Sequence, residues 1–551
     1  MEEKNEGKRK KTRLKKELTF AQLIMIGVVG SLGNGALFGT IDMVSQAGPG
    51  AILAFVFGAV IYLLLGLTYM ELARVYPEAG GPTRYTIYTH GRWTNIINAM
   101  ADIVWYLFIP PVEVIAILLG LNFFNPVFIT SAGSPTYIGV LAGVALLLAF
   151  VPFNYFGVRQ FGRSTTITGL VKLFFYLSLV IGLIVTVFNY KNLYSYNGIL
   201  PYGGASIFAI MPFAMYDFGA TRVIPDLAEE AKMKEKVPKA IFLTILIESL
   251  IYIGVAFAIL MGTNWSALNV SAGNYHGLLS GNSQLTGQNP FFVFSSYSGS
   301  YFVFIAAIVT GLLAPFVTGY IYLGSGTRVL FSMGRSGYIS EHLKNIDAKH
   351  SIPVVSLVIF AVVGAILVFI TAPVPNIYTF IDDATAAGYI GLVSTPVALM
   401  VSRRQGVTKD DMKVKGMNII APVSMGLAAL IVFWTGWTSL EYAVVLIFAG
   451  SIVFGAISKV KIGKLEALWY VGFIIFELVM TAISNDGYTG SPVPQVFTFI
   501  QGTLVVFVVT ILVFYPLGII SGFKEQFSHK TWTDPYKDMA SEPSPTKTSS
   551  E

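Results

Sequence analysis

Long apolar stretches recur along the chain and constrain its fold more than any other feature. A helix needs about 20 mostly apolar residues to cross the hydrocarbon core of a bilayer. Only 12% of the 551 residues are charged, which is about half the share in a soluble domain. We therefore expect an all-α polytopic membrane protein rather than a soluble enzyme, a nucleic-acid-binding protein or a disordered chain. Fourteen stretches are candidate spans: 19–46, 50–72, 94–122, 136–156, 165–189, 203–228, 238–263, 292–327, 352–372, 376–401, 417–437, 440–458, 465–484 and 496–520.

The positions of the basic residues predict how the chain is oriented. Lys and Arg gather in segment 1–18 and in the connections after even-numbered stretches, whereas the odd-numbered connections hold only Lys191. Short basic loops stay on the cytoplasmic side of a membrane. We expect a multi-pass plasma membrane protein with both termini cytoplasmic, a basic N-terminal tail and a disordered tail at 523–551. The net charge of +6 is then mainly an orientation signal, and the lipid bilayer rather than nucleic acid is the expected partner.

Signatures of catalysis or metal binding are sparse in this sequence. The chain has no cysteine and only five scattered histidines, so neither a thiolate site nor a zinc cluster is expected. No nucleotide-binding loop and no nucleophile–base set stands out, which predicts neither an enzyme nor a cofactor. The polar loop 264–291 carries two glycosylation acceptors, Asn264 and Asn269, and these are either used or chance matches.

Glycines crowd the first apolar stretch. Five of them fall within residues 27–39, including the sequence Gly33-Asn34-Gly35, and each costs roughly 1 kcal/mol relative to alanine in a plain helix. They either let helices pack closely, as in Gly35-x-x-x-Gly39, or mark an unwound segment between two half-helices. The asparagine favours unwinding, because it tolerates turn geometry and supplies its own hydrogen bonds.

The sixth stretch carries a similar irregularity. Pro212 and Pro225 flank the sequence Met215-Tyr216-Asp217-Phe218-Gly219-Ala220-Thr221-Arg222. Interrupted helices at corresponding positions of two repeats indicate a binding site near the bilayer midplane. A half-helix N-terminus suits a carboxylate and the unpaired carbonyls of a half-helix C-terminus suit an ammonium group. Together they predict a site for a zwitterion such as an α-amino acid.

Four groups of motifs, in order, carry a resemblance to a known family over residues 18–405. The chain resembles amino acid permeases of the amino acid–polyamine–organocation (APC) superfamily. The matching segments are Gly33-Asn34-Gly35 with Ala47-Gly48-Pro49, the run from Tyr69 to Pro82, Leu227-Ala228-Glu229-Glu230 with Val237-Pro238-Lys239-Ala240-Ile241, and the run from Arg328 to Gly337 with Ile352-Pro353.

The resemblance implies a LeuT-like transport core at 19–405. Two inverted five-helix repeats, 19–190 and 203–405, would be followed by peripheral helices at 406–522. It further implies that backbone amides hold the substrate carboxylate while carbonyls hold its ammonium group, with the substrate-binding set Ser31, Leu32, Gly33, Asn34, Gly35, Tyr216, Asp217, Phe218 and Gly219. The chain departs from the usual pattern at Asn34, which is bulkier than the common residue, and at Leu37, where Phe is usual.

Charged residues within apolar stretches are functional candidates by default. Lys172 matches the lysine that proton-coupled and exchanging relatives place against the broken first helix, and burial would let it release and take up a proton. The alternative is a lysine that snorkels to the cytoplasmic end of its helix. Asp217 either sets a preference for cations or pairs with Arg222. Glu71 is expected to cap or pair at the end of its helix. Five further acids are read as structural or as part of a proton path: Asp102, Glu113, Glu248, Asp382 and Asp383. Glu477 lies outside the expected transport core and is assigned no role.

These observations favour a secondary active transporter over other classes of membrane protein. The leading hypothesis is proton-coupled uptake of amino acids by alternating access, with substrate bound between broken helices 1 and 6. An exchanger or a polyamine transporter on the same fold is the first alternative. A non-transporting membrane sensor or scaffold is the second.

Overall fold

The computed structural model describes residues 14–130, 133–371, 377–458, 467–484 and 490–524. Within these ranges the chain forms helices and loops, with two isolated β-bridges. Residues 1–13 of the predicted basic tail and residues 525–551 of the predicted disordered tail lie outside the described residues. So do Lys459, Lys461 and Lys464, which contributed to the predicted orientation.

Eleven described helices are long and apolar enough to cross a membrane. The bent pair α1 (Phe20–Ser31) and α2 (Thr40–Ala47) makes a twelfth candidate, while α15 (Val354–Thr371) and α19 (Leu468–Ile483) are shorter apolar helices. The all-α polytopic class is thereby confirmed, and the count of fourteen spans stays a prediction. The eleven are α3 (Gly50–Val75), α5 (Arg92–Asn122), α6 with α7 (Tyr137–Tyr155), α8 (Val158–Thr186), α10 with α11 (Ala205–Asp226), α12 (Val237–Gly262), α14 (Tyr301–Arg335), α16 (Ile377–Arg404), α17 (Met417–Trp434), α18 (Trp437–Ile457) and α20 with α21 (Phe499–Ser521).

Two predicted boundaries differ from the structure for local reasons. The stretch predicted at 292–327 contains the short helix α13 (Pro290–Ser296) and then α14, separated at Gly299, whose φ of 71° is left-handed. Helix α8 begins at Val158 rather than at 165, because its first two turns carry polar residues that an apolar window excludes. Lys172 therefore lies fourteen residues into α8, roughly 21 Å from the helix start, near its middle.

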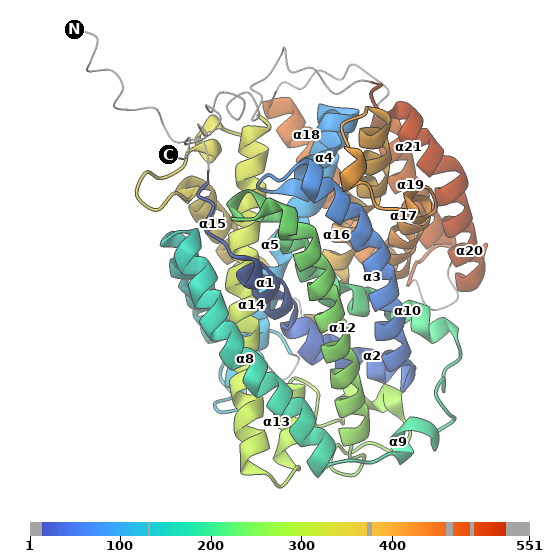
Figure 1. Cartoon of the computed structure of the whole chain (residues 1–551). Helices are drawn as coiled ribbons and strands as arrows, with labels where there is room; N and C mark the ends of the chain where they lie inside the picture. Colours follow the sequence, from blue (N-terminus) through green and yellow to red (C-terminus); the bar gives the residue numbers. More distant parts are fainter. Residues whose placement is uncertain (1–13, 131–132, 372–376, 459–466, 485–489, 525–551) are drawn as a thin grey trace.

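Helix α5 lies at the centre of the bundle. It packs mainly against α14 and α16, while α12 packs on α3 and α8 packs on α14. The broken helix α1 is enclosed by α8, α12 and α14, and Figure 1 shows α17, α19, α20 and α21 gathered on one flank of this core. The elements that contain the predicted breaks are thus held inside the bundle.

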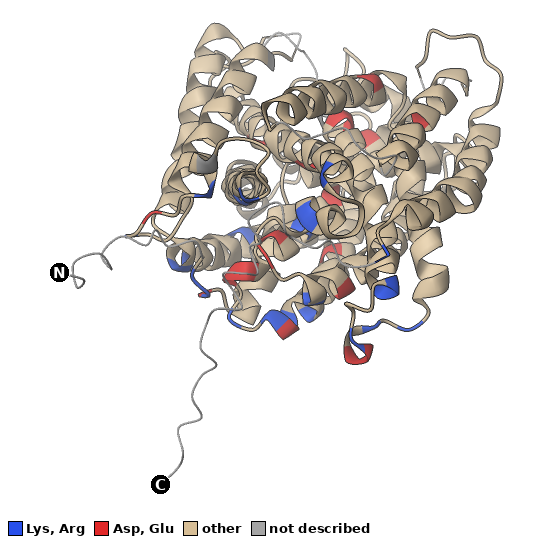
Figure 2. Ribbon diagram, turned by 90° about the horizontal axis from the view of Figure 1, so that it is seen from above, with Lys and Arg blue, Asp and Glu red and all other residues tan. Residues whose placement is uncertain are grey.

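The rim of the bundle is apolar. Helix α8 alone exposes Ile167, Leu170, Phe174 and Ile181, and α12, α15, α18 and α20 also expose large apolar side chains. Figure 2 shows broad stretches of rim helix without charged residues. Such continuous apolar surface is far larger than soluble proteins tolerate, and it matches the hydrocarbon of a bilayer.

The connections after even-numbered stretches meet at one end of the bundle, which we call the basic end. It comprises α4 (Gly81–His90) with segments 228–236, 336–353 and 405–416, whereas α9 (Lys191–Tyr194) and α13 lie at the opposite end (Figure 1). Four ion pairs lie at this end. Glu229–Arg335 and Glu230–Arg328 connect segment 228–236 to α14, Glu71–Arg403 joins α3 to α16, and Glu78–Arg84 connects the turn before α4 to that helix. Glu71 accordingly pairs at the end of its helix, as expected.

Replacing one partner of a buried ion pair with an uncharged residue is expected to destabilise the fold. Arg328 donates two hydrogen bonds to Glu230, at 3.0 and 3.1 Å, and both side chains are almost fully buried. R328M leaves an unpaired buried carboxylate, which costs about 3–5 kcal/mol. We expect a lower unfolding temperature in detergent for R328M and substantial recovery in E230M/R328M.

The exposed pair Lys413–Asp410 offers a matched control. K413A is expected to leave the unfolding temperature unchanged, because exposed pairs contribute little. An R328M protein as stable as wild type would contradict the assigned role of this pair.

Candidate functional site

The first helix breaks where its glycines and asparagine predict. Helix α1 ends at Ser31, a π-helical turn begins at Gly35, and the two halves of the helix are bent by 44° relative to each other. Gly27 and Gly30 instead allow close packing against Thr244 and Ala220. Both proposed uses of glycine therefore occur in one segment: Gly27 and Gly30 serve packing, and the helix opens at Leu32 and Gly33, while Asn34 already has helical backbone angles.

The second irregularity lies in the sixth stretch. Helix α10 (Ala205–Asp217) passes into a 3-10 segment, Phe218–Arg222, which is followed by α11 (Val223–Asp226). Pro212 lies within α10 rather than at the change in helix type. The helical path continues from Ala205 to Asp226 as one span, so Phe218 and Gly219 mark a change from α- to 3-10 geometry rather than an unwound break.

Side chains of α12 join the two interruptions. The Tyr252 hydroxyl donates to the carbonyl of Ser31 at 2.9 Å and to that of Asp217 at 2.8 Å. One turn earlier, Glu248 accepts hydrogen bonds from the hydroxyls of Ser31 and Thr221. The carbonyl ends of both half-helices are thus held against the same helix.

Two buried carboxylates face the glycines on either side of Asn34. The carboxylate of Glu113 on α5 accepts a hydrogen bond from the backbone N–H of Asn34, and the distances from this nitrogen to the two carboxylate oxygens are 3.0 and 3.2 Å. A side chain at Gly33 would overlap Glu113, and one at Gly35 would overlap Asp217 and Tyr216. Asp217 is 2% exposed, and neither of its carboxylate oxygens has a hydrogen-bond partner among the described residues.

Lys172 reaches into the same region from α8. Its ammonium group donates to the carbonyls of Val29 and Ala314, at 2.5 and 2.9 Å, and to the Thr318 hydroxyl at 3.0 Å. The side chain is fully buried, and it ties α1 to α14 just before the break. The snorkelling alternative is therefore wrong: Lys172 lies at mid-helix and points inward.

Arg222 pairs with Asp102 rather than with Asp217. The guanidinium contacts the Asp102 carboxylate, donates to the Gly388 carbonyl at 3.0 Å and lies over the Trp105 ring. The alternative that Asp217 pairs with Arg222 is wrong, because the change to 3-10 geometry after Asp217 directs Arg222 towards α5 and α16. Asp217 remains a buried acid without a counter-ion in the described structure.

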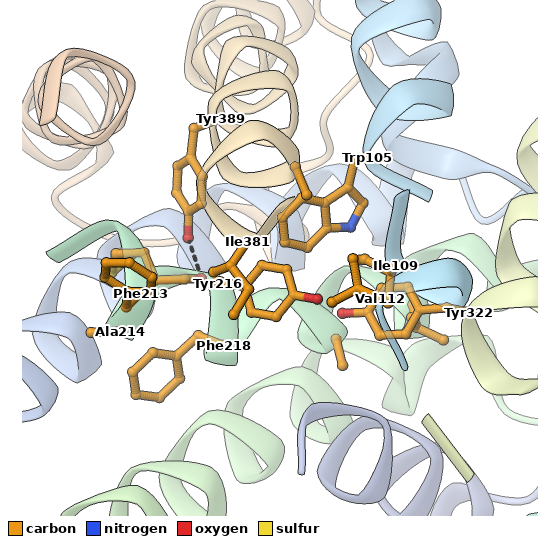
Figure 3. Packing of buried hydrophobic residues seen from close by; sticks show 14 of the residues in the cluster. Trp105, Ile109, Val112, Phe213, Ala214, Tyr216, Phe218, Tyr322, Ile381 and Tyr389 are labelled. Carbon is orange, nitrogen blue, oxygen red and sulfur yellow. Dashed lines mark hydrogen bonds between the residues drawn. The ribbon is translucent and has the colours of Figure 1, made fainter. Parts of the chain in front are cut away.

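Aromatic side chains surround the second interruption. Figure 3 shows Trp105, Tyr216, Tyr322 and Tyr389 converging from α5, α10, α14 and α16. The Tyr216 hydroxyl donates to the Asn34 side-chain oxygen at 3.1 Å, which links the two interruptions directly. Phe218 packs away from this group, between the rings of Tyr62 and Tyr252.

The two ends of the bundle differ in how they cover the site. A cavity of about 550 Å³ opens at the end opposite to the basic end, and its lining includes Phe38, Asp42, Phe213 and Asp382. Phe38 and Phe213 belong to the two interrupted helices, so the cavity reaches the elements that form the candidate site. Ion pairs and backbone contacts hold the described segments of the basic end together.

Glu229 illustrates how firmly the basic end is held. Burial alone would raise the pKa of this carboxyl, but the Arg335 guanidinium and the amides of Ala79 and Leu14 hold the pKa below its ordinary value. The charged form of Glu229 is therefore stabilised in the closed arrangement. The backbone of Leu18 also pairs with that of Glu230 and Lys232, so the segment before α1 is part of this closure.

The structure brings together the residues predicted for the site and adds others. Asn34 contacts Tyr216, Gly35 faces Asp217, and Gly219 packs against Trp105. Glu113, Glu248 and Tyr252 complete the arrangement. Sequence reasoning noted the two glutamates only as buried acids, and Tyr252 carried no distinguishing signal. Among the described residues, no group of three or more His, Asp or Glu is placed to hold a metal ion.

Interrupted helices that meet inside an apolar helical bundle are typical of membrane transport proteins. Residues 18–437 match the family model described as amino acid permease. The chain belongs to the amino acid permease family, which confirms the resemblance drawn from its motifs.

Curated relatives with known roles cover nearly the whole chain. The aspartate-proton symporter of Bacillus subtilis is 25% identical, covering 87% of this chain and 92% of the relative. The glutamate/serine transporter AimA of the same organism is 25% identical, covering 92% of this chain and 94% of the relative. The branched-chain amino acid permease BcaP of Bacillus subtilis is 24% identical, covering 81% of this chain and 94% of the relative.

Gly35→Ala is expected to damage substrate binding while the protein still folds. Its methyl group would displace Asp217 and the Tyr216 ring, and such overpacking costs about 1–3 kcal/mol. We expect at least about a tenfold loss in amino acid affinity, measured by calorimetry on the purified protein.

Gly39→Ala is the matched control in the same segment. A methyl group there would meet Phe213 at 3.8 Å, an ordinary contact, so affinity within about twofold of wild type is expected. Equal affinities for both variants would show that Gly35 is not at the binding site.

Proposed function

We propose that this permease is a secondary active transporter that takes up amino acids by proton-coupled alternating access. The observation that carries the proposal is the meeting of the two interrupted helices, which brings backbone amides and carbonyls to one buried place. The substrate would bind there, with its carboxylate at the amides of Asn34 and Gly35. Its ammonium group would lie at the carbonyls near Ser31 and Leu32 and near Phe218 and Gly219.

Lys172 is the proposed proton-coupling residue. Its ammonium group uses all three N–H donors to bridge α1 and α14. A neutral amine offers fewer donors and would hold these helices less firmly. Protonation would therefore bias the relative positions of α1 and α14. A buried ammonium group is costly unless its hydrogen bonds are kept, so a change in these contacts would change how readily Lys172 holds its proton.

The domain plan follows the family resemblance. Residues 19–405 would form the core, with inverted repeats at 19–190 and 203–405, and residues 406–522 would form peripheral helices. The basic end would face the cytoplasm, because short loops rich in Lys and Arg stay inside. Both termini would then be cytoplasmic in a plasma membrane protein, and the cavity lined by Asp42 and Asp382 would open outward.

The unpartnered Asp217 supports a second candidate on the same fold. A buried carboxylate without a counter-ion favours a substrate that brings an extra positive charge, such as a polyamine or another organic cation. An amino acid exchanger remains the third candidate. The named relatives act on aspartate, on glutamate and serine, and on branched-chain amino acids, so these compounds belong in the first screen.

Uptake into liposomes tests the proposal. Purified protein should accumulate at least one of L-aspartate, L-glutamate, L-serine or L-leucine faster when the outside is acidic. K172A should reduce this pH dependence, whereas K191A, which removes the exposed lysine at the opposite end, should retain it. Uptake that requires an internal amino acid and ignores the gradient would favour exchange, and uptake of putrescine alone would favour the cation transporter.

The orientation can be tested because the chain has no cysteine. A single cysteine placed at the exposed Asn269 should react with a membrane-impermeant maleimide on intact cells. One placed at Lys349 should react only after the cells are permeabilised. The reverse pattern would contradict the proposed cytoplasmic location of the basic end.

A further inference from the structure

Glu113 occupies the position that the proposed function assigns to the substrate carboxylate. Both of its oxygens lie at the Asn34 amide, at 3.0 and 3.2 Å, and the residue is 1% exposed. The Asn34 amide stands at the start of the second half-helix, where backbone N–H groups and the helix dipole favour an anion. The chain thus supplies its own carboxylate to a site built for one.

Gly33, the residue before Asn34, leaves space for the Glu113 carboxylate because it has no side chain. A methyl group at Gly33 would overlap the Glu113 carboxylate and would also lie only 2.8 Å from the side chain of Thr318. The site also holds unused polar atoms, since the Asn34 side-chain nitrogen and both Asp217 oxygens are buried without partners. These groups are available to a ligand with an ammonium group and a carboxylate.

We propose that Glu113 is an internal stand-in for the substrate carboxylate, which holds the Asn34 amide in the empty transporter and leaves it, taking up a proton, when an amino acid binds. This inference rests on the proposed function. Two carboxylates at one N–H group would repel each other at close range, so binding of the substrate carboxylate there favours departure of Glu113. The displaced Glu113 loses its backbone donor and stays buried beside a second acid, Asp217, which favours the neutral form of one of the two.

The charges balance in this exchange. The substrate carboxylate replaces the Glu113 carboxylate at the amide, and the proton taken from solution at the open side neutralises Glu113. Lys172 keeps its proton at this step, because its three acceptors remain in place. When the substrate leaves on the other side, Glu113 returns to the amide and releases its proton there.

Other titratable groups face Glu113 from the helices around it. They are Lys172 on α8, Tyr216 and Asp217 on α10, and Tyr322 on α14, all of which interact with it electrostatically. Glu248 on α12 acts on Asp217 and Tyr322 and is held by Ser31 and Thr221. Arg222 and Asp102 form their own pair. Glu113 is distinguished from these acids by its contact with the amide.

Calorimetry can count the protons taken up on binding. L-serine, L-aspartate and L-leucine are titrated into purified wild-type protein in two buffers of different ionisation enthalpy. The tightest binder should take up about one proton per molecule, and its affinity should rise about tenfold for each unit of pH decrease. In E113Q, proton uptake should fall to near zero and affinity at pH 7 should rise, because a neutral amide competes less well for the site.

Two controls separate the stand-in role from general effects. E477Q removes another fully buried glutamate on α19, outside the interrupted helices, and should keep the proton uptake of wild type. The α-carboxamide of the same amino acid, tested on wild-type protein, lacks the competing carboxylate and should bind weakly without proton uptake. This second measurement needs no variant, so it stands even if E113Q fails to fold.

The outcomes distinguish the two levels of the proposal. Amino acid binding without proton uptake, or equal uptake in E113Q and wild type, would overturn the stand-in role and leave the transporter assignment intact. If none of the three amino acids binds or is transported by the wild-type protein, the proposed function fails and this inference fails with it.

Discussion

Backbone groups exposed by a broken helix must find partners inside the protein, because the hydrocarbon around it offers none. The site satisfies this constraint with its own side chains. Glu113 accepts from the Asn34 amide, and Tyr252 donates to the carbonyls at the ends of α1 and α10. The site therefore holds a carboxylate and a hydroxyl of the chain itself in the places proposed for the two ends of an amino acid.

The rest of the bundle supports this arrangement. Helix α5 carries Glu113 and Trp105 through the centre, α12 carries Glu248 and Tyr252, and α8 carries Lys172. Each of these helices is held by packing on its neighbours, so the polar groups reach the interrupted segments from fixed directions. The buried acids Glu113 and Asp217 and the buried Lys172 are the charged side chains that face the first interruption and its neighbour.

Local sequence predicted the features that depend on local chemistry. Glycines around Asn34 indicated an unwound segment, because neither packing nor helix propensity alone accounts for a polar residue between two glycines in an apolar span. The depth of Lys172 was misjudged, because the polar first turns of α8 were read as a loop. The partners of Asp102, Glu113 and Arg222 could not be predicted, since they depend on how α5 is rotated against α10 and α8.

Tyr252 has one hydroxyl hydrogen but two carbonyl acceptors, which come from different halves of the proposed core. The one hydroxyl hydrogen is shared between the two carbonyls, so each receives part of one bond. A tilt of α1 or α10 alone would end this sharing, whereas a joint tilt would keep it. A single phenol on a third helix therefore anchors both segments to α12 and favours their movement together.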